Sequence, residues 1–171
     1  MRAALPLVAL IAAPAAAEVK SAGDQGFEVS SSAIVRATPA QVYAALGKPG
    51  QWWSSAHSWS GDVRNMTLSL TPGGCFCERL PAKKGAVEHG HVIFAAPGQM
   101  LRLRAALGPL QAEGISGTLT WTMKPVDGGA EIVQTYVVGG YIRAGMRTIA
   151  PPVDAVLAEQ LGRLKAYLEK R

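Results

Sequence analysis

Charged and aromatic side chains are scarce in this chain of 171 residues, at 17% and 6% of the sequence. The formal net charge is +5, but the basic residues are scattered and form no stripe interleaved with aromatics, which argues against nucleic-acid binding. After the first residues, no apolar run is long enough to span a bilayer. The chain also lacks a Gly-x-Ser-x-Gly motif and a phosphate-binding glycine loop, so the sequence indicates neither of these two common active sites.

The amino terminus has the pattern of a secretory signal peptide. A basic start at Arg2 precedes an apolar run from Ala3 to Ala13, and the alanines up to Ala17 fit a small-residue cleavage site. We therefore predict a signal peptide over residues 1–17, cleavage after Ala17, and a periplasmic or secreted protein without stable membrane insertion. A retained membrane anchor is the alternative, but a run of about 11 apolar residues is short for a bilayer span.

The rest of the chain is predicted to form a flexible tail over residues 18–26 and a single domain over 27–171. Thr38 with Gln41 forms a capping box, and Pro39 suits the first helical position, so a short helix should end at Gly47. A second helical turn is expected over 49–53. Alternating apolar and polar residues predict strands over 27–36, 66–71, 75–80, 87–94, 100–107, 118–124 and 131–138.

The last segment, residues 152–171, is predicted to be a long amphipathic helix. Its apolar residues have helical spacing and define one face, at Val153, Val156, Leu157, Leu161, Leu164, Tyr167 and Leu168. A single such helix after a run of antiparallel strands must bury its apolar face against the sheet. The fold class is therefore α+β, and the space between a curved sheet and this helix is a candidate pocket.

Several motifs resemble the START-like superfamily, also called SRPBCC or helix-grip proteins. The segment Thr38–Leu46 is similar to the family's N-capped opening helix, with the pattern "pa-x-x-V-(W/Y)-x-A-L". Trp52-Trp53, the turn at 72–74 with Glu78 after it, and the final helix over 153–165 resemble the branch related to Hsp90-ATPase activator homologues and polyketide cyclases. The similarity covers nearly all of residues 27–170.

This resemblance implies a helix-grip fold, in which a curved antiparallel sheet wraps around the long C-terminal helix, with two short helices after the first strand. It also implies a hydrophobic cavity for a small apolar or aromatic ligand, such as a lipid-like or polyketide-like molecule. A few family members catalyse cyclisation or hydrolysis, and no catalytic set is shared across the superfamily. The predicted export argues against an Hsp90-cochaperone role, because that partner is not exported.

Residues from the aromatic cluster and from the inner strand faces are candidates for lining the ligand cavity. The candidate ligand-binding residues are Trp53, His57, Trp59, Trp121, Met123, Gln134, Tyr136, Met146 and Leu157. Indole and imidazole N–H groups at a cavity mouth fix the orientation of a ligand. The alternative for the inner-facing residues is ordinary core packing, which sequence alone separates poorly from cavity lining.

The pattern Cys75-x-Cys77 followed by His89-x-His91 is a second candidate site. If the hairpin is symmetric about Lys83, Cys77 faces His89 and Cys75 faces His91, so four ligands suited to zinc or copper share one sheet face. A slip of one residue would send the histidines to the opposite face. A strained Cys75–Cys77 disulfide is the other option, since same-face strand neighbours lie about 6.6 Å or more apart.

A cyclase- or hydrolase-type enzyme is the alternative function, with a cavity Glu or His as general base. Glu78 and Glu88 are expected on the face opposite the Cys/His set, near Arg102 and Arg104, where a buried carboxylate would have a raised pKa. Cross-strand ion pairs on a solvated face are the plainer interpretation. We expect no cofactor and no metal, and a small hydrophobic molecule as the partner; the oligomeric state stays open.

Overall fold

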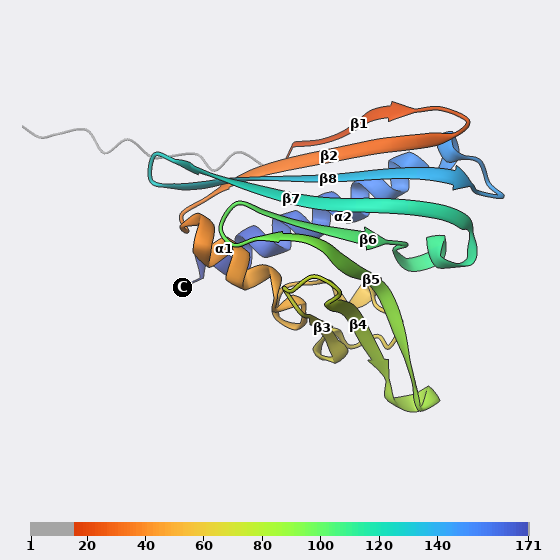
Figure 1. Ribbon diagram of the computed structural model, residues 1–171, viewed down its shortest axis with the longest axis horizontal. Coiled ribbons are helices and arrows are strands. Elements are labelled where there is room, and N and C mark those ends of the chain that lie inside the picture. Colours follow the sequence, from red (N-terminus) through yellow and green to blue (C-terminus); the bar gives the residue numbers. More distant parts are fainter. Residues whose placement is uncertain (1–15, 171) are drawn as a thin grey trace, which may run out of the picture.

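The chain is built on one antiparallel sheet and one long helix (Figure 1). The computed structural model describes residues 16–170, with side chains from Glu18 onward, so the predicted signal peptide lies outside the described residues except for Ala16 and Ala17. The strands run in the spatial order β1-β2-β8-β7-β6-β5-β4-β3. Their bounds are β1 Ala16–Ala22, β2 Gly26–Val35, β3 Met66–Leu68, β4 Cys75–Leu80, β5 Gly85–Ala96, β6 Met100–Ala105, β7 Gly114–Val126 and β8 Gly129–Tyr141.

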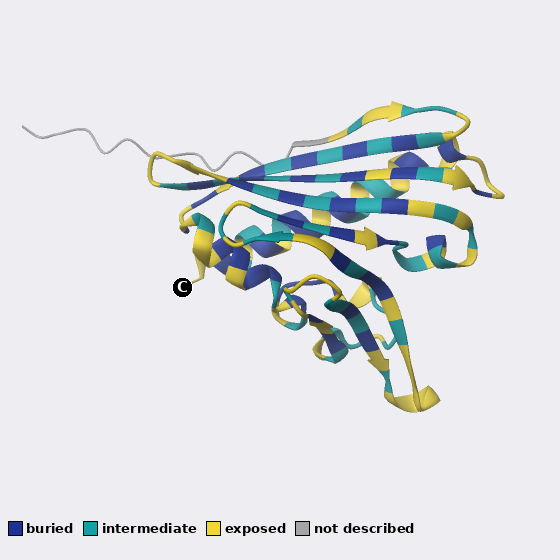
Figure 2. Ribbon diagram, viewed as in Figure 1, coloured by how far each residue is buried: buried dark blue, intermediate teal, exposed yellow. Residues whose placement is uncertain are grey.

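Two α-helices and five short 3-10 turns complete the described part of the chain. They are α1 Pro39–Leu46, η1 Pro49–Gln51, η2 Ser55–His57, η3 Val63–Asn65, η4 Pro81–Lys83, η5 Gly108–Ala112 and α2 Met146–Glu169. The α2 helix lies along the concave side of the curved sheet, which confirms the predicted α+β helix-grip arrangement (Figure 1). Buried residues alternate along β7 and β8 (Figure 2), as expected of strands with one face on the core.

The apolar face of α2 is buried, as its spacing predicts. Leu157, Leu161, Leu164 and Leu168 are all buried, and α2 packs mainly on β2 and β1. The helix begins six residues earlier than predicted, at Met146, so its prolines at 151 and 152 lie inside it. Met146 and Ala150 are both buried, and this packing supports a segment that propensity alone would leave non-helical.

The helix α1 has the predicted N-terminal cap. The Gln41 N–H donates to Thr38 Oγ1 over 3.3 Å, and the Thr38 N–H donates to Gln41 Oε1 over 2.8 Å. Two backbone donors that the helix leaves free are therefore satisfied reciprocally. Its buried side holds Val42, Tyr43 and Leu46, so α1 is anchored on the core directly before the aromatic loop of the candidate site.

The prediction of a flexible tail over 18–26 is wrong. Residues 16–22 form the edge strand β1, which pairs with β2 in a register that places Val19 opposite Val29. Glu18 and Lys20 form an ion pair on its exposed side. The ladder of backbone hydrogen bonds requires no alternation of apolar side chains, and for this reason the polar composition of the segment did not indicate a strand.

Candidate functional site

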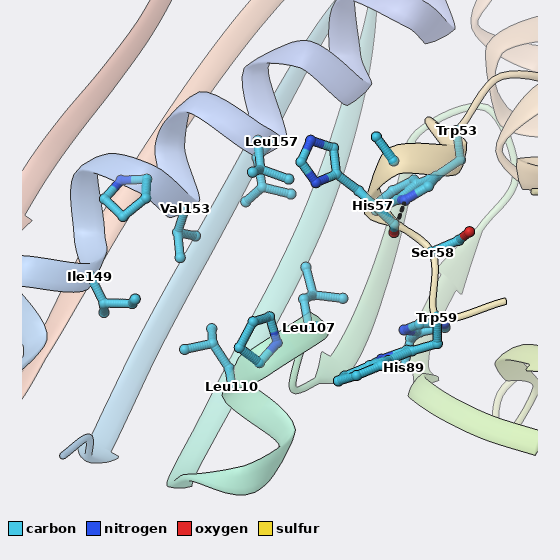
Figure 3. A pocket seen from close by; sticks show the side chains of 15 residues that line it. Trp53, His57, Ser58, Trp59, His89, Leu107, Leu110, Ile149, Val153 and Leu157 are labelled. Carbon is cyan, nitrogen blue, oxygen red and sulfur yellow. Dashed lines mark hydrogen bonds between the residues drawn. The ribbon is translucent and has the colours of Figure 1, made fainter. Parts of the chain in front are cut away.

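A pocket of about 370 Å³ opens between the first half of α2, the turn η5 and the loop that contains η2 (Figure 3). In the view of Figure 3, Ile149 and Val153 of α2 lie on one side, and Trp59 with His89 lies on the other. Most of the lining is apolar. The lining residues are Trp53, Ala56, His57, Ser58, Trp59, His89, Leu107, Gly108, Pro109, Leu110, Ile149, Pro152, Val153, Val156 and Leu157.

Hydrogen bonds and ring contacts hold the aromatic wall of the pocket in place. The indole Nε1 of Trp53 donates to the His57 carbonyl over 3.0 Å, which ties the two ends of this short loop together (Figure 3). Trp52 Nε1 donates to the Ala45 carbonyl over 2.9 Å, which fixes the loop to α1. The Trp53 ring meets Phe76 edge-on at 5.4 Å between centroids, so the wall rests on strand β4.

Four of the nine predicted ligand-binding residues line this pocket. Trp53, His57 and Trp59 come from the aromatic loop, and Leu157 comes from α2. At the rim, His57 Nε2 lies 3.0 Å from a carboxylate oxygen of Glu159, and both side chains are partly exposed. The structure therefore brings the aromatic cluster and the last helix together, and contact of these residues with a ligand stays a prediction.

The other five predicted residues lie in the solid core and do not line the pocket. Trp121, Met123, Gln134, Tyr136 and Met146 are all at most 4% exposed. These bulky side chains fill the space between the sheet and α2, where the cavity was expected. The open space therefore lies to one side, between the first half of α2, the aromatic loop and η5.

The polar groups of this filled interior satisfy one another. Gln134 accepts a hydrogen bond from Trp121 Nε1 over 2.8 Å and donates to the Leu157 carbonyl over 2.9 Å. Tyr136 donates its hydroxyl to the Ala105 carbonyl over 3.0 Å. Burial raises the pKa of Tyr136 well above its usual range, so this phenol stays neutral. Gln134 and Tyr136 are thus structural polar groups of the core.

A buried carboxylate–imidazole pair contributes its imidazole to the wall of the pocket. Glu78 of β4 is fully buried and His89 of β5 is 4% exposed, with 3.0 Å between Glu78 Oε2 and His89 Nε2. The same carboxylate accepts the backbone N–H groups of Trp59 and Ser60, over 3.0 and 2.5 Å. Glu78 therefore positions both His89 and the loop that carries Trp59. The His89 ring also packs on Phe76, with centroids 5.1 Å apart.

The two partners share a direction of pKa shift but differ in its cause. Burial raises the pKa of Glu78, but the hydrogen bonds from Ser60, Trp59 and His89 together outweigh burial, and the net pKa is lowered. Burial lowers the pKa of His89, and the nearby Glu78 offsets part of that effect. At neutral pH the pair therefore consists of a carboxylate and a neutral imidazole, in contrast to the raised carboxyl pKa expected from the sequence.

A β-bulge turns His89 into the pocket. The β4–β5 register pairs Cys75 with His91 and Phe76 with Gly90, but pairs Cys77 with Glu88, so His89 is the extra residue. A bulge of this kind leaves one residue unpaired, disrupts the ladder locally and re-aims the side chain of that residue. The predicted pairing of Cys75 with His91 is confirmed, and the pairing of Cys77 with His89 is wrong.

The bulge also rules out the predicted convergence of Cys75, Cys77, His89 and His91. His89 points inward, while the other three share the outer face of the hairpin. Cys75 and Cys77 form a disulfide with 5.3 Å between their Cα atoms, closer than the straight-strand spacing used in the sequence argument. Within residues 18–170, no group of three or more His, Cys, Asp or Glu side chains is arranged to hold a metal ion.

Glu78 and Glu88 lie on opposite faces, which corrects the expectation that they share one. Glu88 is exposed and lies 2.8 Å from His91 Nδ1. Arg104 and Arg102 bond to Ser116 and Thr120 and do not approach Glu78. The bulge at His89 is again the reason, because the residues before it on β5 are shifted by one position relative to β4.

Sequence reasoning missed His89 as a pocket residue and missed the whole of η5. Helical periodicity already placed Val153 and Val156 on the buried side of the last helix, so the sequence could have identified these two residues as pocket lining. Leu107 and Leu110 sit in a turn with no regular pattern. A pairing register was needed to find His89, and register depends on contacts between strands.

The comparisons agree with this fold. The sequence matches the family described as "Polyketide cyclase / dehydrase and lipid transport" over residues 26–169, and the chain belongs to this family. None of the curated proteins matches the chain in sequence. Among residues 16–170, no helix combines the length and apolar character needed to cross a membrane.

Solved structures with the same fold share little sequence with this chain. Protein MLL2253 from Mesorhizobium loti has a TM-score of 0.59 and 16% identity, over 82% of this chain and 96% of its own. A conserved protein of unknown function from Enterococcus faecalis, EF2215, has a TM-score of 0.61 and 14% identity, over 91% and 77%. CalU16 from Micromonospora echinospora has a TM-score of 0.60 and 11% identity, over 90% and 81%. At these identities the likeness establishes the fold alone.

Proposed function

We propose that this chain is an exported domain that binds a small apolar or aromatic molecule, lipid-like or polyketide-like, in the pocket beside α2. The observation that carries this proposal is the pocket itself, about 370 Å³ in volume and lined mainly by apolar side chains. Small-molecule sites are typically pockets of about 300–1,000 Å³ with a few convergent polar groups. The description of the family, which includes lipid transport, supports the same class of ligand.

Binding would draw its free energy from the removal of apolar surface from water. Each Å² of apolar surface buried contributes about 25 cal/mol before the ordering of ligand and side chains is subtracted. Trp59 is 48% exposed although it is a large apolar residue, and it stands at the pocket with His57. These two side chains are suited to cover and orient a bound ring.

A pair of matched substitutions tests whether ligands bind here. Val153→Trp fills the pocket from α2, whereas Val137→Trp adds the same side chain at an exposed position of β8. With the fluorescent dye anilinonaphthalene sulfonate as the probe, we expect Val153→Trp to weaken binding at least about tenfold, which corresponds to about 1.4 kcal/mol. Val137→Trp should bind like the unmodified chain. Equal affinity in all three proteins would refute the proposed site.

Native mass spectrometry of the protein as purified identifies the natural ligand class. We expect a co-purified molecule with mainly apolar carbon, and we expect Val153→Trp to carry less of it. A bound molecule that is retained equally by Val153→Trp would lie elsewhere on the chain and contradict the proposal.

Export is supported by the signal-like amino terminus and by the disulfide between Cys75 and Cys77. Disulfides persist in oxidising compartments such as the bacterial periplasm. Cleavage after Ala17 would leave Glu18–Ala22 of β1 paired with β2. Expression of the full chain in a bacterial host, followed by fractionation and intact-mass measurement, tests this. A cytoplasmic protein that retains residues 1–17 would refute export.

A further inference from the structure

We propose that His89, positioned by Glu78, is a general base that removes a proton from a carbon next to a carbonyl group in the bound ligand. This inference rests on the proposed function, because the ligand must first occupy the pocket. It adds a reaction to a site that the fold alone marks as a binding cavity. The substrate class is an apolar or aromatic carbonyl compound with an acidic C–H bond.

The hydrogen bonds around the pair determine which nitrogen of His89 is free. The Glu78 carboxylate accepts hydrogen bonds and has none to donate, so the proton of neutral His89 lies on Nε2, 3.0 Å from Glu78 Oε2. The lone pair of the ring is therefore on Nδ1. No group of residues 18–170 donates to Nδ1.

The free nitrogen is in contact with open space. Within the described residues, Gln160 Nε2 is the one side-chain polar atom that is both fully buried and without a hydrogen-bond partner. Since Nδ1 of His89 also lacks a partner and is not in this class, it is not fully buried. His89 lines the apolar pocket, and it also lines a second hollow of about 220 Å³ between β5, β6 and β7. A nearly buried imidazole with an unshared electron pair on Nδ1 thus lines a site for apolar molecules.

The surroundings of the pair suit proton transfer. When Nδ1 takes the proton, the C–H electron pair moves onto the carbonyl oxygen as an enolate, and His89 becomes an imidazolium next to the Glu78 carboxylate. The proton then returns to the same carbon or to another carbon of the enolate, so no oxidant or reductant is consumed. Glu78 stabilises the cation, in the role that a buried carboxylate has beside a catalytic histidine.

The other charged groups that line the two hollows have partners of their own. His57 and its partner Glu159 lie at the rim of the apolar pocket. The second hollow is lined by Glu88 and His91 of β5, which bond to each other, and by Arg104 of β6, which bonds to Ser116. Burial has the largest effect on the pKa of His89 and lowers it, and Glu78, the charged group in direct contact with the imidazole, offsets part of this effect.

The test uses the full chain with β-tetralone, an aromatic ketone with an acidic C–H bond between its ring and its carbonyl group. Displacement of anilinonaphthalene sulfonate measures binding, and the gain of deuterium from heavy water, followed by NMR, measures proton removal. We expect exchange at least about a hundredfold faster than with free imidazole at the same concentration. His89→Gln should lose at least about tenfold of this rate while still binding the ketone. His91→Gln is the matched control and should keep the full rate.

Glu78 is tested as a positioning residue through the pH profile. In the unmodified chain, the exchange rate should fall as His89 is protonated, at a pH below the ordinary histidine value of 6.5. In Glu78→Gln the inflection should move to lower pH and the plateau should drop, because the carboxylate no longer favours the imidazolium. Glu88→Gln, which alters the exposed pair with His91, should leave both features unchanged.

The outcomes separate the inference from the proposed function. Binding of β-tetralone with equal exchange in the unmodified chain and in His89→Gln would overturn the role of His89 and leave the binding site intact. A chain that does not bind the ketone or the dye would overturn both. If His89→Gln does not fold, the pH profile of the unmodified chain decides, and a rate that shows no fall on acidification down to the pH at which the chain unfolds would overturn the inference.

Discussion

The apolar face of α2 is tested most directly by Leu161→Ala. Leu161 is fully buried in the core and is not a lining residue of the pocket, so the substitution should change stability without changing the site. Alanine has the higher helix propensity, so the helix itself is not weakened. The change deletes three buried carbons at about 0.8 kcal/mol each, or about 2.4 kcal/mol, and the cavity left behind brings the expected loss to roughly 2–5 kcal/mol.

Guanidinium unfolding followed by circular dichroism measures this loss. For a domain of this size, a loss of 3 kcal/mol lowers the melting temperature by roughly 6–12 °C. Val156→Ala is the control on the same helix, since Val156 is half-buried at the pocket and should lose only about 1 kcal/mol. A loss below about 1 kcal/mol for Leu161→Ala would refute the argument that packing of this face holds the helix on the sheet.

Three further predictions concern acid stability, the first helix and the cysteines. In the folded state the pKa values of Glu78 and His89 lie below their ordinary values of 4.5 and 6.5, so the unfolded chain binds more protons and acid favours unfolding. Denaturant melts should therefore show the free energy of unfolding falling as the pH drops below about 6.5, and falling further as Glu78 is protonated below about 4.5; stability that stays constant over this range would contradict the buried pair. Thr38→Ala removes one half of the capping box of α1 and should cost about 1 kcal/mol in the same melts, whereas the exposed cap should leave dye binding unchanged. Metal analysis of untagged protein should give equal content for the unmodified chain and for Cys75→Ser/Cys77→Ser, because the disulfide and the inward turn of His89 separate the four residues; metal lost in the double variant would refute this.

Local patterns in the sequence were sufficient for much of the fold. The capping box at Thr38 concerns residues three positions apart, and the apolar spacing from Leu157 to Leu168 follows from the geometry of a helix. The predicted bounds of the strand at 75–80 agree with the observed ones, because turn residues and alternation mark both of its ends. These features depend on near neighbours along the chain, and tertiary contacts stabilise them without changing them.

The candidate site depends on contacts between segments that are distant in the sequence. The bulge at His89 exists only in the pairing of β4 with β5, and it decides that His89 joins Glu78 while His91 faces outward. The N-terminal strand β1 follows from backbone pairing with β2, which its polar composition does not reveal. The pocket lies beside α2 because large core side chains fill the space beneath it. Register, pairing and volume are properties of contacts between segments, so the sequence alone determined the elements that carry a local pattern, and the tertiary structure decided β1, the start of α2 and the site.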